Sequence, residues 1–196
     1  MIATGILVAA AATLLAFAGL GMTGHMTAHM GAVAIAAPIL AFSAPAPDGG
    51  RGRGAGGWRC ADGRSPLLLA MAEFGVVWGW HLPVLRDATD MSVGLALLEQ
   101  AMFLIVGFLL WRAALSRPAE GVAALLVTSM HMTLLGALIG LADRPLYAMM
   151  AMHPAPGLDP VADQQLGGVV MLLVGGASYC LGGLWLLATM LRTRAA

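Results

Sequence analysis

The sequence has few charged residues, and lysine is absent from it. Only 10% of the 196 residues are charged, whereas an average soluble domain contains about 25%. The ten basic residues are all arginine and are balanced by ten acidic residues, so the formal net charge at pH 7 is zero. A neutral chain without a dense basic patch lacks the electrostatic footprint of a nucleic-acid-binding protein.

Cysteines and catalytic motifs are also scarce. The two cysteines, Cys60 and Cys180, lie in a Gly-rich segment and in the last apolar run, and neither belongs to a Cys-x-x-Cys pair. This placement argues against a disulfide and against a thiolate metal site. The sequence contains no Ser–His–Asp arrangement, phosphate-binding loop, dinucleotide-binding fingerprint or HExxH motif. We therefore expect a protein that is not an enzyme.

Apolar residues, by contrast, are abundant. They make up 60% of the chain, and the mean hydropathy is +0.86. The few charges are clustered between apolar runs, each of which is long enough to cross a bilayer. We therefore expect a single integral membrane domain over residues 1–196, an all-α polytopic helix bundle in which glycine pairs such as Gly167-Gly168 allow close packing. The six expected transmembrane helices are Ile2–Leu20, Gly24–Phe42, Pro66–Leu85, Val93–Trp111, Gly121–Ala142 and Gln165–Leu191.

The arginines set the expected orientation of these spans. Eight of the ten follow the second, fourth or sixth span, and only Arg86 and Arg144 lie on the other side. By the positive-inside rule the arginine-rich side faces the cytoplasm, so both termini are cytoplasmic. A Gly/Arg-rich loop at about residues 44–65 then forms a flexible cytoplasmic linker. Because no Lys or Arg precedes the first apolar run, we expect a retained span rather than a cleaved signal peptide.

Histidine and methionine are concentrated at the start of the second span. His25 and His29 are four residues apart, so they share one face of a helix, and Met22 would join that face. Met26 and Met30 form a second stripe about 100° away. Imidazole binds many metals and thioether favours Cu(I), so the segment predicts a copper site at a membrane surface. The alternative is a helix start with two solvated histidines and ordinary methionine packing.

The remaining histidines fall on the same side of the membrane in the expected topology. His81 closes the third span, His131 lies in the outer half of the fifth, and His153 lies in an outer loop just after three methionines. All five histidines therefore map to the outer half or the outer loops, whereas a random distribution would place some on each side. This bias favours an outer face that handles a metal.

Two carboxylates lie inside the expected spans, Glu73 in the third and Glu99 in the fourth. An ionisable group in hydrocarbon is costly unless it is paired or hydrated, so each is a functional candidate. Two interpretations are open for them: a proton or ion path, or a protonated carboxyl that is hydrogen-bonded to a neighbouring helix. Glu99 is also placed to orient a histidine that binds a metal.

Four segments in this order resemble the multi-pass CtaG family of cytochrome c oxidase assembly factors. They read HMTAHM followed by APIL, WHLPVL, GAL through PLY, and DQQLGGVVM, starting at His25, Trp80, Gly136 and Asp163. The resemblance implies a multi-pass protein of the bacterial inner membrane that helps to deliver copper to a haem–copper oxidase. It also implies that the site residues are His25, His29, His81 and the segment Asp163-Gln164-Gln165.

The leading hypothesis is therefore a copper-handling assembly factor, with Cu(I) as the favoured ion. His25 and His29 bind the ion, and His81 or a nearby methionine, Met22 or Met26, completes a trigonal or tetrahedral site. The expected partners are the haem–copper oxidase subunit that receives the metal, a periplasmic copper chaperone and membrane lipid. The residues expected to support the ligands without binding the ion are Asp163, which would orient an imidazole, Gln164, His131 and Glu99.

Two other functions are alternatives. A small b-type cytochrome would hold haem between His29 and either His81 or His131, because haem needs two histidines from facing helices. An ion or metal transporter would use Glu73, Glu99 and His131. The sequence shows no repeated halves and predicts no strongly broken helix, although both features are common in transporters.

Overall fold

The computed structural model describes residues 1–44 and 64–195, so the loop expected at about residues 44–65 lies outside the described part except at its ends. All regular structure in the described residues is helical, as expected for an all-α chain. In chain order the helices, with η for a π-helical segment, are α1 (Ile2–Ala16), α2 (Gly21–Met30), η1 (Gly31–Ala36), α3 (Ala37–Ser43), α5 (Pro66–Trp80), α6 (Pro83–Asp90), α7 (Val93–Ser116), α8 (Pro118–Gly140), α9 (Ala148–Met152), α10 (Pro160–Val170), η2 (Met171–Gly175) and α11 (Gly176–Ala195).

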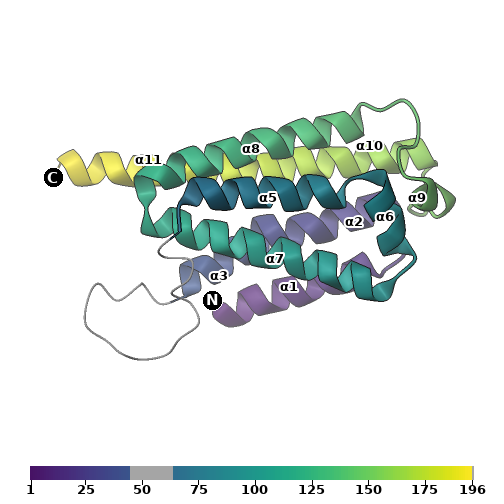
Figure 1. Ribbon diagram of the computed structural model, residues 1–196, viewed down its shortest axis with the longest axis horizontal. Helices are drawn as coiled ribbons and strands as arrows, with labels where there is room; N and C mark the ends of the chain where they lie inside the picture. Colours follow the sequence, from purple (N-terminus) through teal and green to yellow (C-terminus); the bar gives the residue numbers. More distant parts are fainter. Residues whose placement is uncertain (45–63, 196) are drawn as a thin grey trace.

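The helices form a bundle whose members run along one long axis in alternating directions (Figure 1). The continuous rods α2–η1–α3 and α10–η2–α11 lie among α1, α5, α7 and α8. The short helices α6 and α9 lie at one end of the bundle, and both chain termini lie at the other end (Figure 1). Placing the two termini at the same end is the arrangement that the distribution of arginines predicts.

Four helical segments are long and apolar enough to cross a membrane: Gly21–Ser43, Val93–Ser116, Pro118–Gly140 and Pro160–Arg192. The pair α5 and α6 makes a fifth if its two parts form one bent span. α1 is shorter, because its 15 residues rise only about 22 Å against a hydrocarbon core of about 30 Å. The described residues thus form a membrane bundle with four to five candidate spans, and the expected six are not confirmed.

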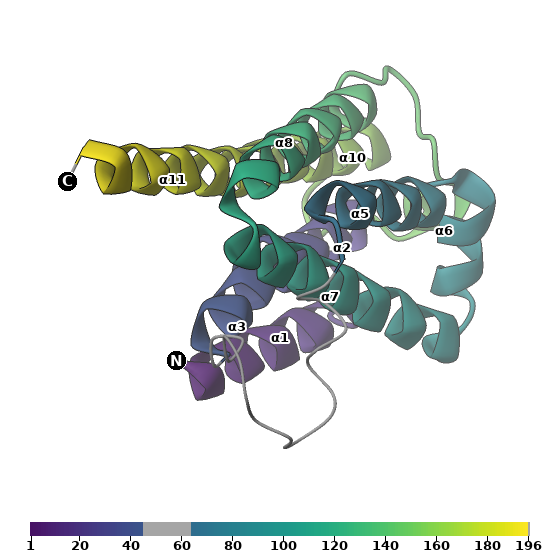
Figure 2. The same cartoon turned by 60° about the vertical axis from the view of Figure 1, so that its left-hand side comes forward.

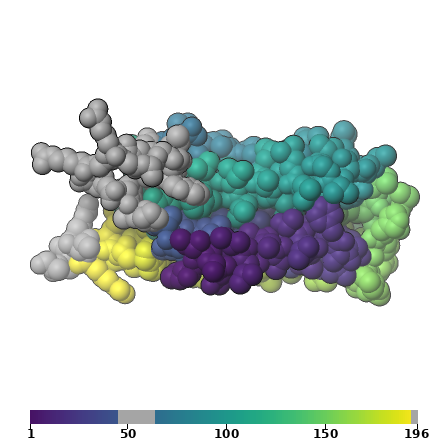
Figure 3. Space-filling model, turned by 90° about the horizontal axis from the view of Figure 1, so that it is seen from below, coloured from purple at the N-terminus to yellow at the C-terminus, as the bar shows by residue number. Residues whose placement is uncertain are grey.

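α1 lies on the outside of the bundle, where it packs against α2, η1 and α3. Figure 3 shows its purple atoms spread along one face, beside the teal atoms of α7. Ile6, Leu7 and Leu14 of this helix are more than half exposed. An apolar surface of this kind is typical of a helix that lipid covers.

The expected third span, Pro66–Leu85, is broken near its end. α5 ends at Trp80, and α6 departs at 68° to it. Pro83 explains the break, because the residue before a proline avoids the helical region and a proline starts a new helix readily. Leu82 is accordingly extended, with φ −65° and ψ 133°, and α6 then crosses the bundle end to reach α7 (Figure 2). The expectation that no helix is strongly broken is therefore wrong.

Two of the rods contain a π-helical turn near the middle, and these turns, η1 and η2, contact each other. In the first rod, Pro38 has no N–H to bond the carbonyl of Ala34, and Ser178 Oγ donates to that carbonyl at 2.7 Å instead. The hydroxyl of Tyr179 lies 3.2 Å from the neighbouring carbonyl of Val33. These bonds between helices satisfy backbone groups that hydrocarbon cannot solvate.

α8 and α10 approach each other backbone to backbone. A Cβ added at Gly168 would lie 2.6 Å from the carbonyl oxygen of Gly136 and 2.6 Å from Cα of Gly140. A Cβ added at Gly136 would lie 2.7 Å from the backbone nitrogen of Leu172. This close approach confirms the packing role that the sequence assigned to Gly167-Gly168.

Candidate metal centre

Three histidines meet at the end of the bundle that α6 covers. His25 and His29 come from α2, and His81 ends α5. One ring nitrogen of each can be chosen so that all three nitrogens lie within 4.8 Å of one another. The residues are buried, with exposed fractions of 5%, 0% and 4%. The fold thus brings together the three histidines that the sequence assigned to one metal site.

The break after α5 orients His81. Its backbone N–H and its ring Nδ1 both point at the carbonyl oxygen of Val77, at 3.2 and 2.6 Å. A ring nitrogen that close to a carbonyl carries the proton and donates it, so Nε2 keeps a free lone pair. Among the described residues Nε2 is buried without a hydrogen-bond partner. This is the tautomer and the orientation that metal-binding histidines commonly show.

The elements that cover the histidines are tied to one another by hydrogen bonds. The hydroxyl of Tyr147 donates to the backbone carbonyl of His81 at 3.1 Å. Burial raises the pKa of Tyr147 to about 12, so the hydroxyl keeps this proton throughout the physiological range. The backbone N–H of Met149 donates to Asp87 Oδ1 at 3.1 Å, which joins α9 to α6.

His29 is held by an aromatic ring. It stacks on Phe103 of α7, with ring centroids 3.8 Å apart and 21° between the planes. Within the described part of the chain, neither of its buried ring nitrogens has a hydrogen-bond partner. Each unsatisfied buried group costs about 1–3 kcal/mol. A bound metal ion would offset this cost, because it uses one of the lone pairs.

His25 has a charged neighbour that the sequence analysis did not assign to the site. Arg86 Nη1 lies 2.6 Å from His25 Nδ1 and 2.8 Å from each carboxylate oxygen of Glu99. Arg86 Nη2 donates to Asp90 Oδ1 at 3.1 Å. Glu99 lies 3.9 Å from His25 Nδ1 and shares Arg86 with it. The expected support of a metal-binding histidine by Glu99 stays a prediction.

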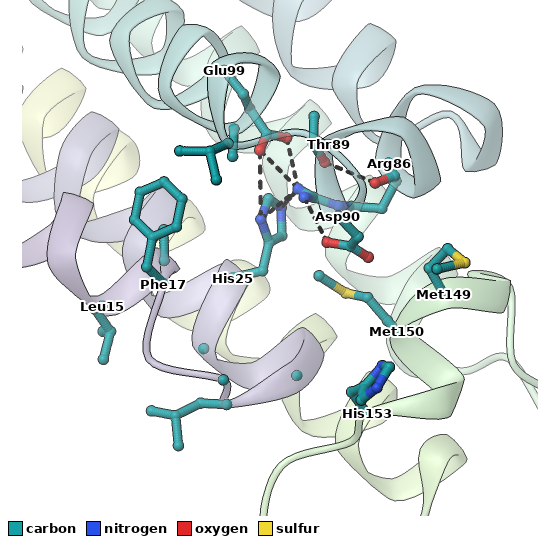
Figure 4. Close-up of a pocket in the computed structure, with 17 residues that line it drawn as sticks. Leu15, Phe17, His25, Arg86, Thr89, Asp90, Glu99, Met149, Met150 and His153 are labelled. Atoms are coloured by element: carbon teal, nitrogen blue, oxygen red, sulfur yellow. Dashed lines mark hydrogen bonds and ion pairs between the residues drawn. The ribbon is translucent and has the colours of Figure 1, made fainter.

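A cavity of about 290 Å³ opens beside His25. Figure 4 shows Arg86 and Asp90 on one wall, and Met149, Met150 and His153 on the wall formed by α9 and the loop after it. His29 and His81 do not line this cavity. The cavity therefore reaches the group of three histidines at His25, beside Arg86.

Asp163 binds the start of α2 rather than an imidazole. Its carboxylate oxygens accept the backbone N–H groups of Met22 at 2.7 Å and Thr23 at 3.0 Å. These are N–H groups that the first turn of a helix leaves without a partner. Gly21 adopts φ +55°, and a Cβ added there would collide with the Asp163 carboxylate, so the position requires glycine. Asp163 therefore positions the helix that carries His25 and His29, which differs from the direct contact that we expected.

Replacing Asp163 by alanine is expected to lower the free energy of unfolding by about 2 kcal/mol, because it removes two charge-assisted bonds to the end of a helix. Thermal unfolding of the detergent-solubilised protein, followed by circular dichroism, measures the change. Asp143→Ala is the control, since Asp143 is an exposed carboxylate in the loop before α9. Equal unfolding temperatures for the two variants would contradict the assigned role.

Gln164 and His131 make contacts of their own. Gln164 Oε1 accepts the backbone N–H of Leu146 at 2.7 Å, and its Nε2 donates to the carbonyl of Arg144 at 3.2 Å. His131 packs edge-on against Phe74, with ring centroids 5.3 Å apart, and lies outside the group of three histidines. Gln164 thus fixes the loop before α9, and support of the metal ligands by Gln164 stays a prediction. The position of His131 outside the group of three argues against such a role for His131.

The expected thioether ligands lie in the apolar core. Met22 and Met26 have exposed fractions of 1% and 0% and belong to the hydrophobic core of the bundle. A Cβ added at Gly167 would lie 3.0 Å from Cγ of Met22, so this side chain packs against α10. Ligation of an ion by Met22 or Met26 therefore stays a prediction.

Glu73, the other carboxylate that the sequence singled out, bonds to a neighbouring helix. The hydroxyl of Tyr179 on α11 is hydrogen-bonded to Glu73 Oε1, and it also lies 3.2 Å from the carbonyl oxygen of Val33. The single proton of the Tyr179 hydroxyl cannot be donated fully to both oxygens. If it goes to the carbonyl of Val33, the carboxyl of Glu73 must carry a proton of its own and donate it to the hydroxyl oxygen. This contact agrees with the interpretation of Glu73 as a protonated carboxyl bonded to another helix.

Comparison with known families decides what kind of protein this is. The family described as cytochrome c oxidase caa3 assembly factor matches residues 2–193. The chain belongs to this family. No curated protein and no solved structure matches the chain. Membership of the caa3 assembly factors confirms the resemblance that the sequence motifs indicated.

The histidines of this caa3 assembly factor fit a metal ion. An ion with bonds of about 2.0 Å to nitrogen holds its ligand atoms about 3.3–3.6 Å apart. Three nitrogens that lie within 4.8 Å of one another would need only small side-chain rotations to reach this spacing. The unpartnered nitrogens of His29 and His81 supply lone pairs for such an ion. Imidazole ligands of this kind suit zinc, copper, iron and nickel.

Two residues of the site, Arg86 and Phe103, were missed in the sequence. Arg86 is one of the two arginines on the arginine-poor side, and it lies between His81 and Asp90 in a short charged segment. That charge cluster beside a histidine was the available signal. Phe103 lies one turn after Glu99 on α7, so the two share a face, but the sequence gives no sign that α7 packs against His29.

Proposed function

We propose that this assembly factor binds one Cu(I) ion at His25, His29 and His81 and passes it to a haem–copper oxidase subunit during assembly. The observation that carries the proposal is the convergence of three buried imidazoles, two of which have unpartnered nitrogens in the described structure. Three neutral ligands in a buried site favour a singly charged ion, because burying net charge is costly. The role is that of a metal carrier, and no bond-forming chemistry is assigned to the site.

The packing of the rings favours an ion over haem. Two axial imidazoles must flank the plane of a porphyrin, with room for the macrocycle between them. Here the centroids of His29 and His81 are 5.2 Å apart, those of His25 and His81 are 5.5 Å apart, and Phe103 covers the face of His29. A single ion needs no such space, so it suits this arrangement better.

The proposal places the site at the outer face of a bacterial inner membrane. α7 and α11 end at the opposite end of the bundle from α6 and α9 (Figure 1), and the arginines at these ends are Arg112, Arg117 and Arg192. Arginines flanking spans favour the cytoplasmic side, which makes both termini cytoplasmic. α1 then completes a bundle of six spans as a short helix, because a bilayer thins locally around a short span.

The cavity offers a route between the histidines and partner proteins. Met149, Met150 and His153 line its outer wall, and His25 lines its inner wall. Thioether and imidazole ligands exchange Cu(I) with one another, since both are soft enough to bind it. A periplasmic copper chaperone would deliver the ion here, and the oxidase subunit would receive it at the surface that α6 and α9 present.

The function is tested in a host strain that lacks this gene. Complementation with the unmodified gene is expected to restore copper in the purified oxidase, whereas complementation with the double variant His29→Ala, His81→Ala leaves the copper-to-haem ratio at the level of the deletion strain. His131→Ala is the matched control, because it removes a buried histidine outside the site. A normal copper-to-haem ratio with the double variant, at equal expression in the membrane, would refute the proposal.

A further inference from the structure

Arg86 Nη1 occupies a position that resembles that of a coordinated cation. Four polar atoms lie around this single nitrogen: His25 Nδ1 at 2.6 Å, His25 Nε2 at 3.2 Å, and both carboxylate oxygens of Glu99 at 2.8 Å. A guanidinium nitrogen of this type carries only two protons, so it cannot donate to all four atoms. The imidazole of His25 and the carboxylate of Glu99 therefore surround the positive charge of Arg86, and directed hydrogen bonds explain only some of these contacts.

Arg86 and a metal ion compete for the same lone pair. A neutral imidazole has one nitrogen with a free lone pair and one that carries a proton. When His25 accepts a hydrogen bond from Arg86, the free lone pair is used, and the remaining nitrogen is protonated and cannot bind an ion. His81 differs, because its proton is directed to Val77 and its Nε2 is available. The charge of the guanidinium also repels any cation that enters the group of three histidines.

The surroundings of Arg86 offer a second position for its side chain. Nη2 already donates to Asp90, four residues later on α6, at 3.1 Å. The carboxylate of Asp90 is partly exposed and lines the cavity, as Arg86 itself does (Figure 4). The cavity volume of about 290 Å³ leaves room for the guanidinium to turn towards Asp90 without leaving the protein.

We propose that Arg86 is an exchangeable internal cation that competes with the metal for His25. It holds the place between His25 and Glu99 until an ion binds, and it then moves towards Asp90 in the cavity. Glu99 thereby keeps a positive partner in both states, since the bound ion replaces the guanidinium. This inference rests on the proposed function, and it explains how a buried site of three histidines releases its ion to a partner: the returning arginine displaces it.

The test measures the affinity of the purified, detergent-solubilised protein for Cu(I) by competition with a chromophoric Cu(I) chelator. Arg86→Gln is expected to tighten binding by about 5- to 150-fold, the usual range for coupling between two sites. Glu99→Gln is expected to weaken binding, because the bound ion then loses the carboxylate that balances its charge. Arg144→Gln is the matched control, since it removes an exposed arginine from the same end of the bundle.

The outcomes separate this inference from the proposed function. Unchanged or weaker binding by Arg86→Gln, while the unmodified protein binds Cu(I), would overturn the role of Arg86 and leave the three-histidine site standing. Absence of Cu(I) binding by the unmodified protein would overturn both. Should Arg86→Gln not survive purification, the double variant Arg86→Gln, Glu99→Gln has no unpaired buried charge. It is expected to bind more tightly than Glu99→Gln alone, and equal affinity would overturn the inference.

Discussion

Purified protein that carries both His29→Ala and His81→Ala is expected to lose Cu(I) binding. Loss of a residue that merely orients a metal ligand costs about 10- to 100-fold in affinity, so removing two of three ligands is expected to cost more than about 100-fold. These two histidines are the better choice for the experiment, because their free nitrogens have no competing partner in the described structure. Competition with a chromophoric Cu(I) chelator measures the change.

His131→Ala is the control for this experiment. His131 is also a buried histidine, and its ring nitrogens also lack partners among the described residues, but it lies outside the group of three. Its variant is therefore expected to keep the affinity of the unmodified protein. If both variants bind Cu(I) equally well, the ion is held elsewhere and the site assignment is wrong. A Soret absorption band in the purified protein would instead indicate haem.

Gly168→Ala, which adds one methyl group between α8 and α10, is expected to lower the free energy of unfolding strongly. The added Cβ would meet the carbonyl oxygen of Gly136 and the Cα of Gly140, which are backbone atoms of the facing helix. A backbone atom cannot rotate away as the end of a side chain can, so α8 and α10 must separate. We expect a loss of about 3 kcal/mol, the upper part of the range for overpacked sites. Thermal unfolding in detergent measures it.

Gly75→Ala is the matched control for the packing experiment. It makes the same chemical change within helix α5, but no atom lies within 4 Å of the added Cβ. Alanine is favoured over glycine in a helix by about 0.5–1 kcal/mol, so this variant is expected to be as stable as the unmodified protein or slightly more so. The packing explanation fails if the two variants unfold at the same temperature.

The part of the site that lies on one helix was predictable from the spacing of its histidines in the sequence. His25 and His29 lie four residues apart, and α2 places both in the group of three. His81 was predictable as a neighbour, because the expected topology put the end of the third span on the same side. The role of Asp163 was not predictable, since the backbone N–H groups that it binds belong to residues about 140 positions earlier in the chain.

The position of Arg86, which the sequence did not reveal, depends on the break at Pro83. A continuous third span would carry Arg86 beyond the membrane, whereas the 68° bend lays α6 across the bundle end and brings Arg86 to His25. The six expected spans are not confirmed for a related reason, because hydropathy registers apolar runs and not where a helix ends. α1 ends after 15 residues, well before the apolar run does.

The π turn η1 changes the direction in which side chains point on the two halves of its rod, α2 and α3. A π turn holds an extra residue relative to an α-helix, so every side chain beyond it is rotated by about 100°. The half that ends at Met30 brings His25 and His29 beside His81, and the half that begins at Ala37 directs Phe42 towards Trp111 of α7. A one-residue deletion within Gly31–Ala36 would turn one half against the other. The count of residues between the two halves, and not only their identity, thus determines where the histidines point.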